Sequence, residues 1–488
     1  MNEIIRFENV SYTYPFQTHK ALDGISFAVP AGEAVLCTGA SGCGKSTLVR
    51  MLNGLIPHYF HGNMQGRVRV CGAETATCHI HEISRYVGTL FQEPEQQFFA
   101  LTVADELAFA LECRGIAPEQ IQAKIRAEAD RFRLAHLMAA SVFDLSEGEK
   151  QKVALASILA QSPSVIVLDE PSANLDPGAT EEFARILTDL KQQGMTLFIV
   201  DHRLYWLNKL VDRAFVLENG RICETGSFSI LEKRSVQDRY GLRQTRVQAP
   251  SVAMVSAGQA DGEGFRIENL SFAFKNRTPV FESAAAFLPK ASVIAVTGAN
   301  GAGKTTFARL LTGLLRPRSG EIHYRGRTAS PKDLLKHGSI VLQNTDHQLH
   351  MKTAGQELAA AARHLPKAER RQRAKDLLGF FNLSDFIDRH PQSLSGGQKQ
   401  RLVIACGIIK DPDILILDEP TSGLDGLNMR IIANAIKKLS ENGTCVLVIS
   451  HDQELISTAC THVLAVPLAR QAADSAAPGH AVGFRNKK

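Results

Sequence analysis

Gly39-Ala-Ser-Gly-Cys-Gly-Lys-Ser46 is the stretch that decides the fold, and Gly298-Ala-Asn-Gly-Ala-Gly-Lys-Thr305 repeats its pattern in the second half of the chain. Both fit G-x-x-x-x-G-K-[ST], and each follows a short apolar run that is typical of a buried strand. Glycines let the backbone curl around a polyphosphate, the lysine neutralises β/γ oxygens, and the Ser or Thr hydroxyl ligates Mg²⁺. The two stretches therefore predict two nucleotide sites.

The residues expected to bind ATP in these loops are Gly39, Ser41, Gly42, Cys43, Gly44, Lys45, Ser46 and Thr47, and Gly298, Asn300, Gly301, Ala302, Gly303, Lys304, Thr305 and Thr306.

The composition is that of an ordinary globular protein. The 488 residues are 44% hydrophobic and 22% charged, and the formal net charge of +5 is too small to argue for nucleic acid. No apolar run reaches the ~18 residues of a membrane helix, and the start of the chain lacks a signal-peptide layout. Nine cysteines without a C-x-x-C pair favour free thiols in a reducing compartment. We expect a cytosolic chain that reaches a membrane only through partners.

A zinc site is one alternative for a cluster of four possible metal ligands: Cys71, Cys78, His79 and His81. Its spacing matches no standard ligand pattern, so solvated or half-buried side chains on a β-rich segment are favoured.

The two halves of the chain carry the same sequence motifs in the same order. Asn9-Val-Ser-Tyr-Thr-Tyr14 aligns with Asn269-Leu-Ser-Phe-Ala-Phe274, and its alternation predicts an edge strand in each half. Tyr14 and Phe274 are candidates to stack on adenine, although packed core aromatics are the plain alternative.

A glutamine ends the next apolar strand in each half, Gln92 after Leu90-Phe91 and Gln343 after Val341-Leu342. Its amide oxygen can reach both Mg²⁺ and the attacking water. The Lys-to-Gln interval is 92 − 45 = 47 residues in the first half and 343 − 304 = 39 in the second, which indicates an insertion around His58 to Asn63. Helical periodicity over 103–111 and 118–138 predicts a helical lobe inserted into the α/β core.

Leu145-Ser-Glu-Gly-Glu149 and Leu394-Ser-Gly-Gly-Gln398 each open a helix with a serine as N-cap. A hydroxyl, glycine N–H groups and a helix N-terminus also form an anion-binding edge. The candidate ATP contacts on these two edges are Ser146, Gly148, Ser395, Gly396, Gly397 and Gln398.

Paired acids follow a central strand in each half, in Val165-Ile-Val-Leu-Asp-Glu-Pro171 and Ile414-Leu-Ile-Leu-Asp-Glu-Pro420. We expect Asp169 and Asp418 to hold Mg²⁺, and Glu170 and Glu419 to orient or deprotonate water. Because adjacent strand residues point to opposite sides, the two acids can serve two roles.

A histidine ends the following strand in both halves, at the same distance from the glutamate: 202 − 170 = 32 and 451 − 419 = 32. His202 and His451 are therefore predicted to contact a γ-phosphate rather than to be structural. With Ser46, Gln92, Asp169, Thr305, Gln343 and Asp418 as Mg²⁺ ligands, the candidate site set is complete.

The predicted boundaries are a first ATPase domain at 1–234, a linker at 235–264, a second ATPase domain at 265–469 and a flexible tail at 470–488.

This ordered set of motifs resembles the ATP-binding-cassette (ABC) ATPases across nearly the whole chain. The resemblance implies an α/β fold of two P-loop NTPase cassettes, each with a RecA-like parallel sheet, an antiparallel β subdomain and an inserted helical subdomain. It also implies crosswise sites. Site one would join Lys45, Gln92, Asp169, Glu170 and His202 to 395–398 of the second half, and site two would join Lys304, Gln343, Asp418, Glu419 and His451 to 146–149.

Phe91-Gln-Glu-Pro-Glu-Gln-Gln-Phe-Phe99 with Thr102-Val-Ala-Asp-Glu-Leu-Ala-Phe109 is similar to the segment after the glutamine in energy-coupling-factor (ECF) transporter ATPases. That similarity implies uptake of a vitamin, a vitamin precursor or cobalt and nickel ions, with a transmembrane coupling (T) protein and a substrate-capturing (S) membrane protein as partners. The ATPase would sit at the cytoplasmic face of the membrane, where Glu93 and Glu95 could complement a basic helix of the T protein.

Three alternatives remain: a tandem ATPase of a monosaccharide importer, a ribosome-associated tandem ATPase, and a DNA-maintenance ATPase. The 94–99 stretch disfavours the first. The second usually has a long charged arm between cassettes, and the third needs a coiled coil or a zinc insertion; neither is visible here.

The first half departs from the family pattern at Glu147 and Glu149, where Gly and Gln are usual. A carboxylate ~6 Å from the γ-phosphate is opposed by roughly 3 kcal/mol at an effective dielectric of about 20. We therefore expect site one to perform most of the hydrolysis, with site two turning ATP over more slowly.

Overall fold

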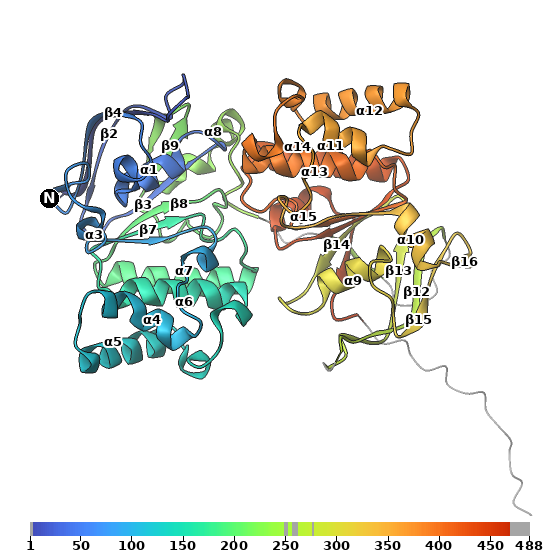
Figure 1. The fold of residues 1–488 in the computed structure, drawn as a ribbon, viewed down its shortest axis with the longest axis horizontal. Helices are drawn as coiled ribbons and strands as arrows, with labels where there is room; N and C mark the ends of the chain where they lie inside the picture. The colour runs from blue at the N-terminus through green and yellow to red at the C-terminus, as the bar shows by residue number, and fades with distance from the viewer. Residues whose placement is uncertain (1–2, 248–251, 256–261, 276–277, 469–488) are drawn as a thin grey trace, which may run out of the picture.

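The computed structural model describes residues 3–247, 252–255, 262–275 and 278–468. The chain forms two halves of the same architecture, each with a six-stranded sheet and a four-stranded sheet. In Figure 1 the helical lobe of the first half, with α4 (Val103–Cys113) and α5 (Pro118–Arg131), lies at the opposite end of the molecule from that of the second half, with α11 (Ala354–Ala361) and α12 (Lys367–Phe380). The halves are therefore arranged head to tail. Among the described residues, no helix combines the length and the apolar character needed to cross a bilayer.

In the first half, the antiparallel sheet has the order β2-β1-β4-β5 and the second sheet has the order β10-β9-β3-β8-β7-β6. The strands are β1 (Glu3–Thr13), β2 (Leu22–Pro30), β3 (Ala34–Gly39), β4 (Asn63–Val70), β5 (Ala73–Glu74), β6 (Val87–Leu90), β7 (Val165–Asp169), β8 (Thr196–Val200), β9 (Arg213–Glu218) and β10 (Arg221–Gly226). The helices are α1 (Lys45–Leu52), α2 (Leu55–His58), α3 (Ile80–Ile83), α4 (Val103–Cys113), α5 (Pro118–Arg131), α6 (Glu147–Ala160), α7 (Pro177–Gln192) and α8 (Arg234–Tyr240).

In the second half, the corresponding orders are β13-β12-β15-β16 and β11-β20-β14-β19-β18-β17. The strands are β11 (Ala253–Met254), β12 (Gly264–Phe272), β13 (Phe281–Pro289), β14 (Val293–Thr297), β15 (Ser319–Tyr324), β16 (Arg327–Thr328), β17 (Gly338–Val341), β18 (Ile414–Asp418), β19 (Cys445–Ile449) and β20 (His462–Ala465). The helices are α9 (Lys304–Leu311), α10 (Pro331–His337), α11 (Ala354–Ala361), α12 (Lys367–Phe380), α13 (Gly396–Ile408), α14 (Gly426–Glu441) and α15 (Gln453–Ala459).

The parallel strands are apolar because helices cover both faces of their sheets. Strands β3, β7 and β8 of the first half, and β14, β18 and β19 of the second, are buried along almost their whole length. Their carboxyl ends meet at one edge of each sheet. This edge therefore collects the phosphate loop, the paired acids and the histidine of each half.

The expectation of an edge strand at Asn9–Tyr14 and Asn269–Phe274 is wrong. β1 lies between β2 and β4, and β12 lies between β13 and β15. Alternating polarity reports one solvated face of a strand, whereas its position in the sheet depends on partners that come later in the chain. The helical pattern at 118–138 also ends early, because α5 stops at Arg131.

The range 235–264, expected to be a linker, is in part structured. It contains most of α8, strand β11 and the first residue of β12, while 248–251 and 256–261 lie outside the described residues, as do 470–488 of the expected tail. β11 pairs with β20 of the second half. Around His58 to Asn63, the expected insertion is α2 and a short connection into β4.

Candidate nucleotide sites between the two halves

The two phosphate loops have the same geometry. Lys45 Nζ donates to the Gly39 and Ala40 carbonyls at 3.0 and 2.9 Å, and Lys304 Nζ donates to the Gly298 and Ala299 carbonyls at 2.8 and 3.0 Å. Gly39 has φ 149°, and a Cβ built there would lie 2.2 Å from the Leu217 carbonyl oxygen. Only glycine fits, because the loop leaves its strand in a conformation that L side chains rarely adopt.

The paired acids separate through backbone conformation rather than through strand alternation. β7 and β18 end at Asp169 and Asp418, and the next residues, Glu170 and Glu419, have φ of 49° and 45°. Non-glycine residues in this region are uncommon and cluster at functional sites. The left-handed turn directs each glutamate away from the sheet and toward the histidine of the same half.

The contacts between glutamate and histidine differ in the two halves. His202 Nε2 lies 3.4 Å from Glu170 Oε1. Glu419 instead accepts from the His451 backbone N–H at 3.2 Å and from the Ser450 hydroxyl at 3.0 Å, while His451 Nε2 lies 3.2 Å from Lys304 Nζ.

Burial shifts the titration of these groups. It raises the pKa of Glu170 to about 8 and that of Glu419 to about 7, the latter held lower by Arg203 and by the Ser450 hydrogen bond. Burial also raises the pKa of Asp169 to about 6 and, with Lys304, lowers the pKa of His451 to about 4. Glutamates of this kind can hold a proton near neutral pH, as general acid–base groups must.

A cleft of about 1650 Å³ joins the halves at site one. It brings the first phosphate loop together with Gln92, Glu170 and His202, and across the interface with Ser395 and its neighbours, as the crosswise arrangement predicts. The site-one candidates that line it are Tyr14, Ser41, Gly42, Gly44, Lys45, Ser46, Thr47, Gln92, Glu170, His202, Ser395, Gly396, Gly397 and Gln398. Gln343 and Glu419, assigned to site two, also reach this cleft.

The turn that follows each Asp-Glu-Pro contributes contacts that the sequence analysis did not assign. The Ser41 backbone N–H donates to Asp425 Oδ2 at 2.6 Å across the interface. A Cβ built at Gly423 would lie 2.7 Å from Gln92 Nε2 and 3.2 Å from Glu170 Oε2. The Leu-Asp pair that recurs after each Asp-Glu-Pro was the available signal for Asp425.

At site two, Thr305 Oγ1 donates to Asp418 Oδ2 at 2.9 Å, so a hydroxyl and a carboxylate converge beside the second phosphate loop. Across the interface, Gln343 Nε2 donates to Asn174 Oδ1 at 3.4 Å, and the negative charge of Asp176 raises the pKa of His451 against the larger effect of burial. Within the described residues, the interactions we find between site two and the first half run through Asn174, Asp176 and Arg203, whose charge acts on Glu419 and His451. None of them involves Ser146 or Gly148.

Ser146 and Ser395, here called the signature serines, both cap their helices, but with different partners. Ser146 donates from its backbone N–H and its hydroxyl to the Glu149 carboxylate, at 2.8 and 2.6 Å. Ser395 donates only its backbone N–H, to Gln398 Oε1 at 2.9 Å, and its hydroxyl accepts from the Gln398 N–H. Glu147 is paired with Lys150 at 3.0 Å. The first-half edge therefore carries two carboxylates that are already engaged.

The candidate adenine contacts differ as well. Tyr14 lines the cleft, and its hydroxyl accepts from Arg50 at 2.7 Å and lies 3.2 Å from Thr47 Oγ1. Phe274 is half-exposed and packs edge-on against Phe272 at 5.0 Å. The zinc alternative finds no support, since no group of three or more possible ligands occurs in the described part of the chain and His79 caps α3.

Comparison with known proteins places the fold in a family. The ABC transporter family matches residues 22–173 and 283–422. A Treponema denticola protein named "Putative ABC transporter ATP-binding protein" is 36% identical over 94% of this chain and 95% of its own length. The Bacillus subtilis "Putative HMP/thiamine import ATP-binding protein YkoD" is 34% identical over 95% of this chain and 90% of its own length.

Among solved structures, one of ribosome-bound archaeal Pelota and ABCE1 aligns with a TM-score of 0.68, 21% identity, and coverage of 94% of this chain and 76% of that one. Likeness at this identity supports the tandem fold alone. The predicted fold class and ATPase activity are confirmed by the family match and the relatives. The chain belongs to the ABC transporter family, as an ATP-hydrolysing component with two cassettes in one polypeptide.

Proposed function

We propose that this protein is the energising ATPase of an ECF-type importer, which couples ATP binding and hydrolysis at its two inter-cassette sites to uptake of a micronutrient. The micronutrient is a vitamin, a vitamin precursor, or a cobalt or nickel ion. Support comes from the segment after Gln92 and from the similarity to the relative named for HMP/thiamine import.

The observation that carries the proposal is an apolar surface on the first half, here called the Phe99 surface: Phe91, Phe99, Leu101, Phe109 and Phe143. All five are exposed, Phe99 by 76%, Leu101 by 72% and Phe143 by 55%. Phe99 and Phe109 stack with ring centroids 5.0 Å apart, and the Leu101 carbonyl accepts from the Val142 N–H beside Phe143. Exposed apolar patches of this kind mark protein–protein contacts.

The partner proposed for this surface is a T protein, with an S protein completing the transporter. Of the two acids expected to attract a basic helix, Glu95 is paired with Lys150 at 2.7 Å. Glu93 accepts from the Gln96 side chain. Because the charge of Glu95 is already paired with Lys150, the proposed attraction rests mainly on apolar contact. Docking places the ATPase at the cytoplasmic face of the membrane without a span of its own.

The proposed chemistry uses groups of this chain at both sites. Glu170 and Glu419 orient and deprotonate water, and His202 and His451 contact the γ-phosphate. Ser46, Asp169 and Gln92, and Thr305, Asp418 and Gln343, are the oxygen donors that would hold Mg²⁺, which neutralises phosphate charge when bound. The Thr305–Asp418 contact fits this donor set. ATP bridges the cassettes, and loss of the γ-phosphate lets them part.

The test is affinity purification of the full chain from membranes, with identification of the co-purifying proteins and of the small molecule on the smallest one. Recovery of two membrane proteins and a micronutrient supports the proposal. A membrane pair that carries a monosaccharide, or ATP-dependent sedimentation with ribosomes, overturns it. Substitution of both Lys45 and Lys304 by Ala is expected to abolish transport.

A further inference from the structure

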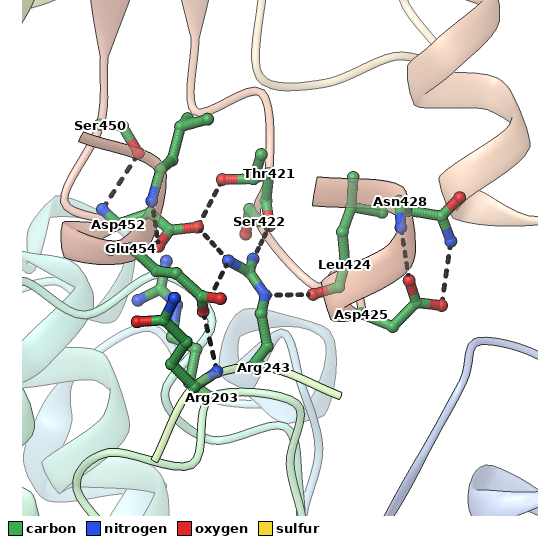
Figure 2. A network of polar contacts seen from close by, with 12 residues as sticks. Arg203, Arg243, Thr421, Ser422, Leu424, Asp425, Asn428, Ser450, Asp452 and Glu454 are labelled. Carbon is green, nitrogen blue, oxygen red and sulfur yellow. Dashed lines mark hydrogen bonds and ion pairs between the residues drawn. The ribbon is translucent and has the colours of Figure 1, made fainter. Parts of the chain in front are cut away.

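One buried arginine holds the turn after each Asp-Glu-Pro, here called the first Asp loop (172–176) and the second Asp loop (421–425). In the first, Arg203 Nη1 donates to the Ser172 and Leu175 carbonyls at 3.0 and 3.4 Å. In the second, Arg243 donates through Nη2 to the Thr421 carbonyl at 3.3 Å and through Nε to the Leu424 carbonyl at 3.0 Å (Figure 2). Since 421 − 172 and 424 − 175 both equal 249, the same two carbonyls are held in both halves.

The two arginines come from different places. Arg203 follows His202 within its own cassette, but the equivalent position of the second half, 203 + 249 = 452, is an aspartate. Arg243 belongs to the segment after α8 and reaches into the other half, where it pairs with Asp452 at 2.8 Å and lies 3.5 Å from Glu454. The second cassette therefore receives its arginine from the connection between the halves.

The carboxylates that accept from the two Asp loops also come from positions that are not equivalent in the two halves. Ser172 Oγ donates to Asp201 Oδ2 at 2.7 Å, and Thr421 Oγ1 donates to Asp452 Oδ2 at 2.7 Å. In the first half, the sequence Asp201-His202-Arg203 supplies both the carboxylate and the guanidinium that hold the loop. In the second half, the equivalent sequence Ser450-His451-Asp452 supplies only the carboxylate.

The segment that carries Arg243 packs against the N-terminal part of α14. The Gly241 carbonyl accepts from the Leu427 N–H at 3.2 Å, and the Leu242 carbonyl accepts from Arg430 at 3.3 Å. A Cβ built at Gly426 would lie 2.2 Å from the Leu242 oxygen, so only glycine admits the segment. In the first half, the equivalent position is occupied by Pro177.

The second Asp loop faces site one through Asp425 on the Ser41 N–H and through Gly423 beside Gln92 and Glu170. We propose that Arg243 is a positioning residue for site one: the connection between the cassettes supplies, in trans, the arginine that fixes the second Asp loop against Glu170 and Gln92. This inference requires ATP hydrolysis and is independent of which solute is transported.

The test measures ATP turnover of the full chain in two backgrounds, E419Q, which leaves site one, and E170Q, which leaves site two. Arg243→Ala is expected to lower kcat at least ~10-fold in the E419Q background, with KM for ATP within ~2-fold, and to change kcat less than ~2-fold in the E170Q background. Gly426→Ala is expected to act in the same direction. The matched control is Arg246→Ala, because Arg246 is an exposed arginine of the same segment, paired with Glu232.

Two further variants separate positioning from folding. Arg243→Lys retains the charge but cannot reach both carbonyls, so kcat at site one should fall while the melting temperature stays near that of the parent. Adding Ser450→Asp and Asp452→Arg to Arg243→Ala rebuilds the arrangement of the first half and should restore site-one kcat at least ~3-fold. Equal loss at both sites, no loss, or a rebuilt variant that regains its melting temperature without turnover would overturn the proposal.

Discussion

The segments that follow Gln92 and Gln343 share their internal contacts and differ in what they expose. Gln97 Oε1 accepts from the Phe91 N–H at 3.2 Å, and Gln348 Oε1 accepts from the Leu342 N–H at 3.1 Å. Glu106 accepts from two successive backbone N–H groups, and Glu357 does the same. Side-chain contacts thus fix the same backbone twice, and leaving the buried Glu106 and Glu357 unpaired would be costly.

The outward side chains of these segments have diverged. Phe99, Leu101, Phe109 and Phe143 of the first half correspond in sequence to His350, Lys352, Ala360 and Gln392 of the second. The halves differ again at their signature serines, where Glu149 stands opposite Gln398. A duplicated fold can therefore keep the same backbone contacts in both halves while its exposed surfaces diverge, one apolar and one polar. Its two nucleotide sites diverge as well.

The largest expected effect tests whether the two sites are unequal. Glu170→Gln should lower ATP turnover of the assembled transporter more than ~10-fold, because it disables the site that faces Ser395 to Gln398. Glu419→Gln should lower it ~3-fold or less. Steady-state ATPase assays on both variants make the comparison, and equal losses would mean that the carboxylates at 147 and 149 do not distinguish the sites.

Next in size is the comparison of the two surfaces. Replacing Phe99 and Leu101 by Asp should reduce recovery of the membrane partners ~10-fold, because charge would replace an apolar contact. The matched control replaces His350 and Lys352 by Asp at the equivalent positions and should reduce recovery less. Quantitative co-purification measures the loss of partner recovery in both variants. A stronger loss from the control would mean that the partners dock mainly on the second half, contrary to the proposal.

A smaller gain is expected from Glu149→Gln in the E170Q background. The substitution gives Ser146 the Ser–Gln pairing seen at Ser395, and it removes a negative charge from the edge that the crosswise arrangement assigns to site two. Turnover at site two should rise ~3-fold. A fall in turnover would show that Glu149 supports that site rather than opposing it.

The smallest effect is on stability against pH in nucleotide-free protein with a chelator present. The pKa of Glu170 is raised from 4.5 to about 8 on folding, so the folded state binds more protons between these values and stability falls as pH rises through the window. Glu170→Gln should therefore melt at least ~3 °C above the parent at pH 8.5, with the difference vanishing near pH 4.5. Glu419→Gln should show the same trend over the narrower window that ends at about 7. Thermal melts that show no pH-dependent difference would contradict the buried placement.

Much of the candidate site could be predicted because its residues stand at the ends of apolar strands. The motif spacing located the loops of Lys45 and Lys304, the paired acids and the histidines. The reason given for separating Asp169 from Glu170 was wrong, since it comes from a left-handed turn that strand periodicity cannot indicate.

Other features depend on partners distant in the sequence. The place of β1 inside its sheet is set by β4, which begins only at Asn63, whereas β1 ends at Thr13. Arg243 gave no signal by itself, because a single arginine in a polar stretch has no periodicity. Aligning Arg203 with Asp452 could have shown that the second half lacked a cation.

The contact of residues 241–243 with α14 determines where the chain could be cut into two separately produced cassettes. A break placed before Gly241 would keep Arg243 on the second cassette, where it compensates the buried Asp452 and Glu454. A break placed after Arg246 would leave the guanidinium on the first piece as the anchor through which the separated products reassociate. The two cassettes are in this sense not interchangeable modules, and a swap between homologous proteins should carry 241–246 along with the second cassette.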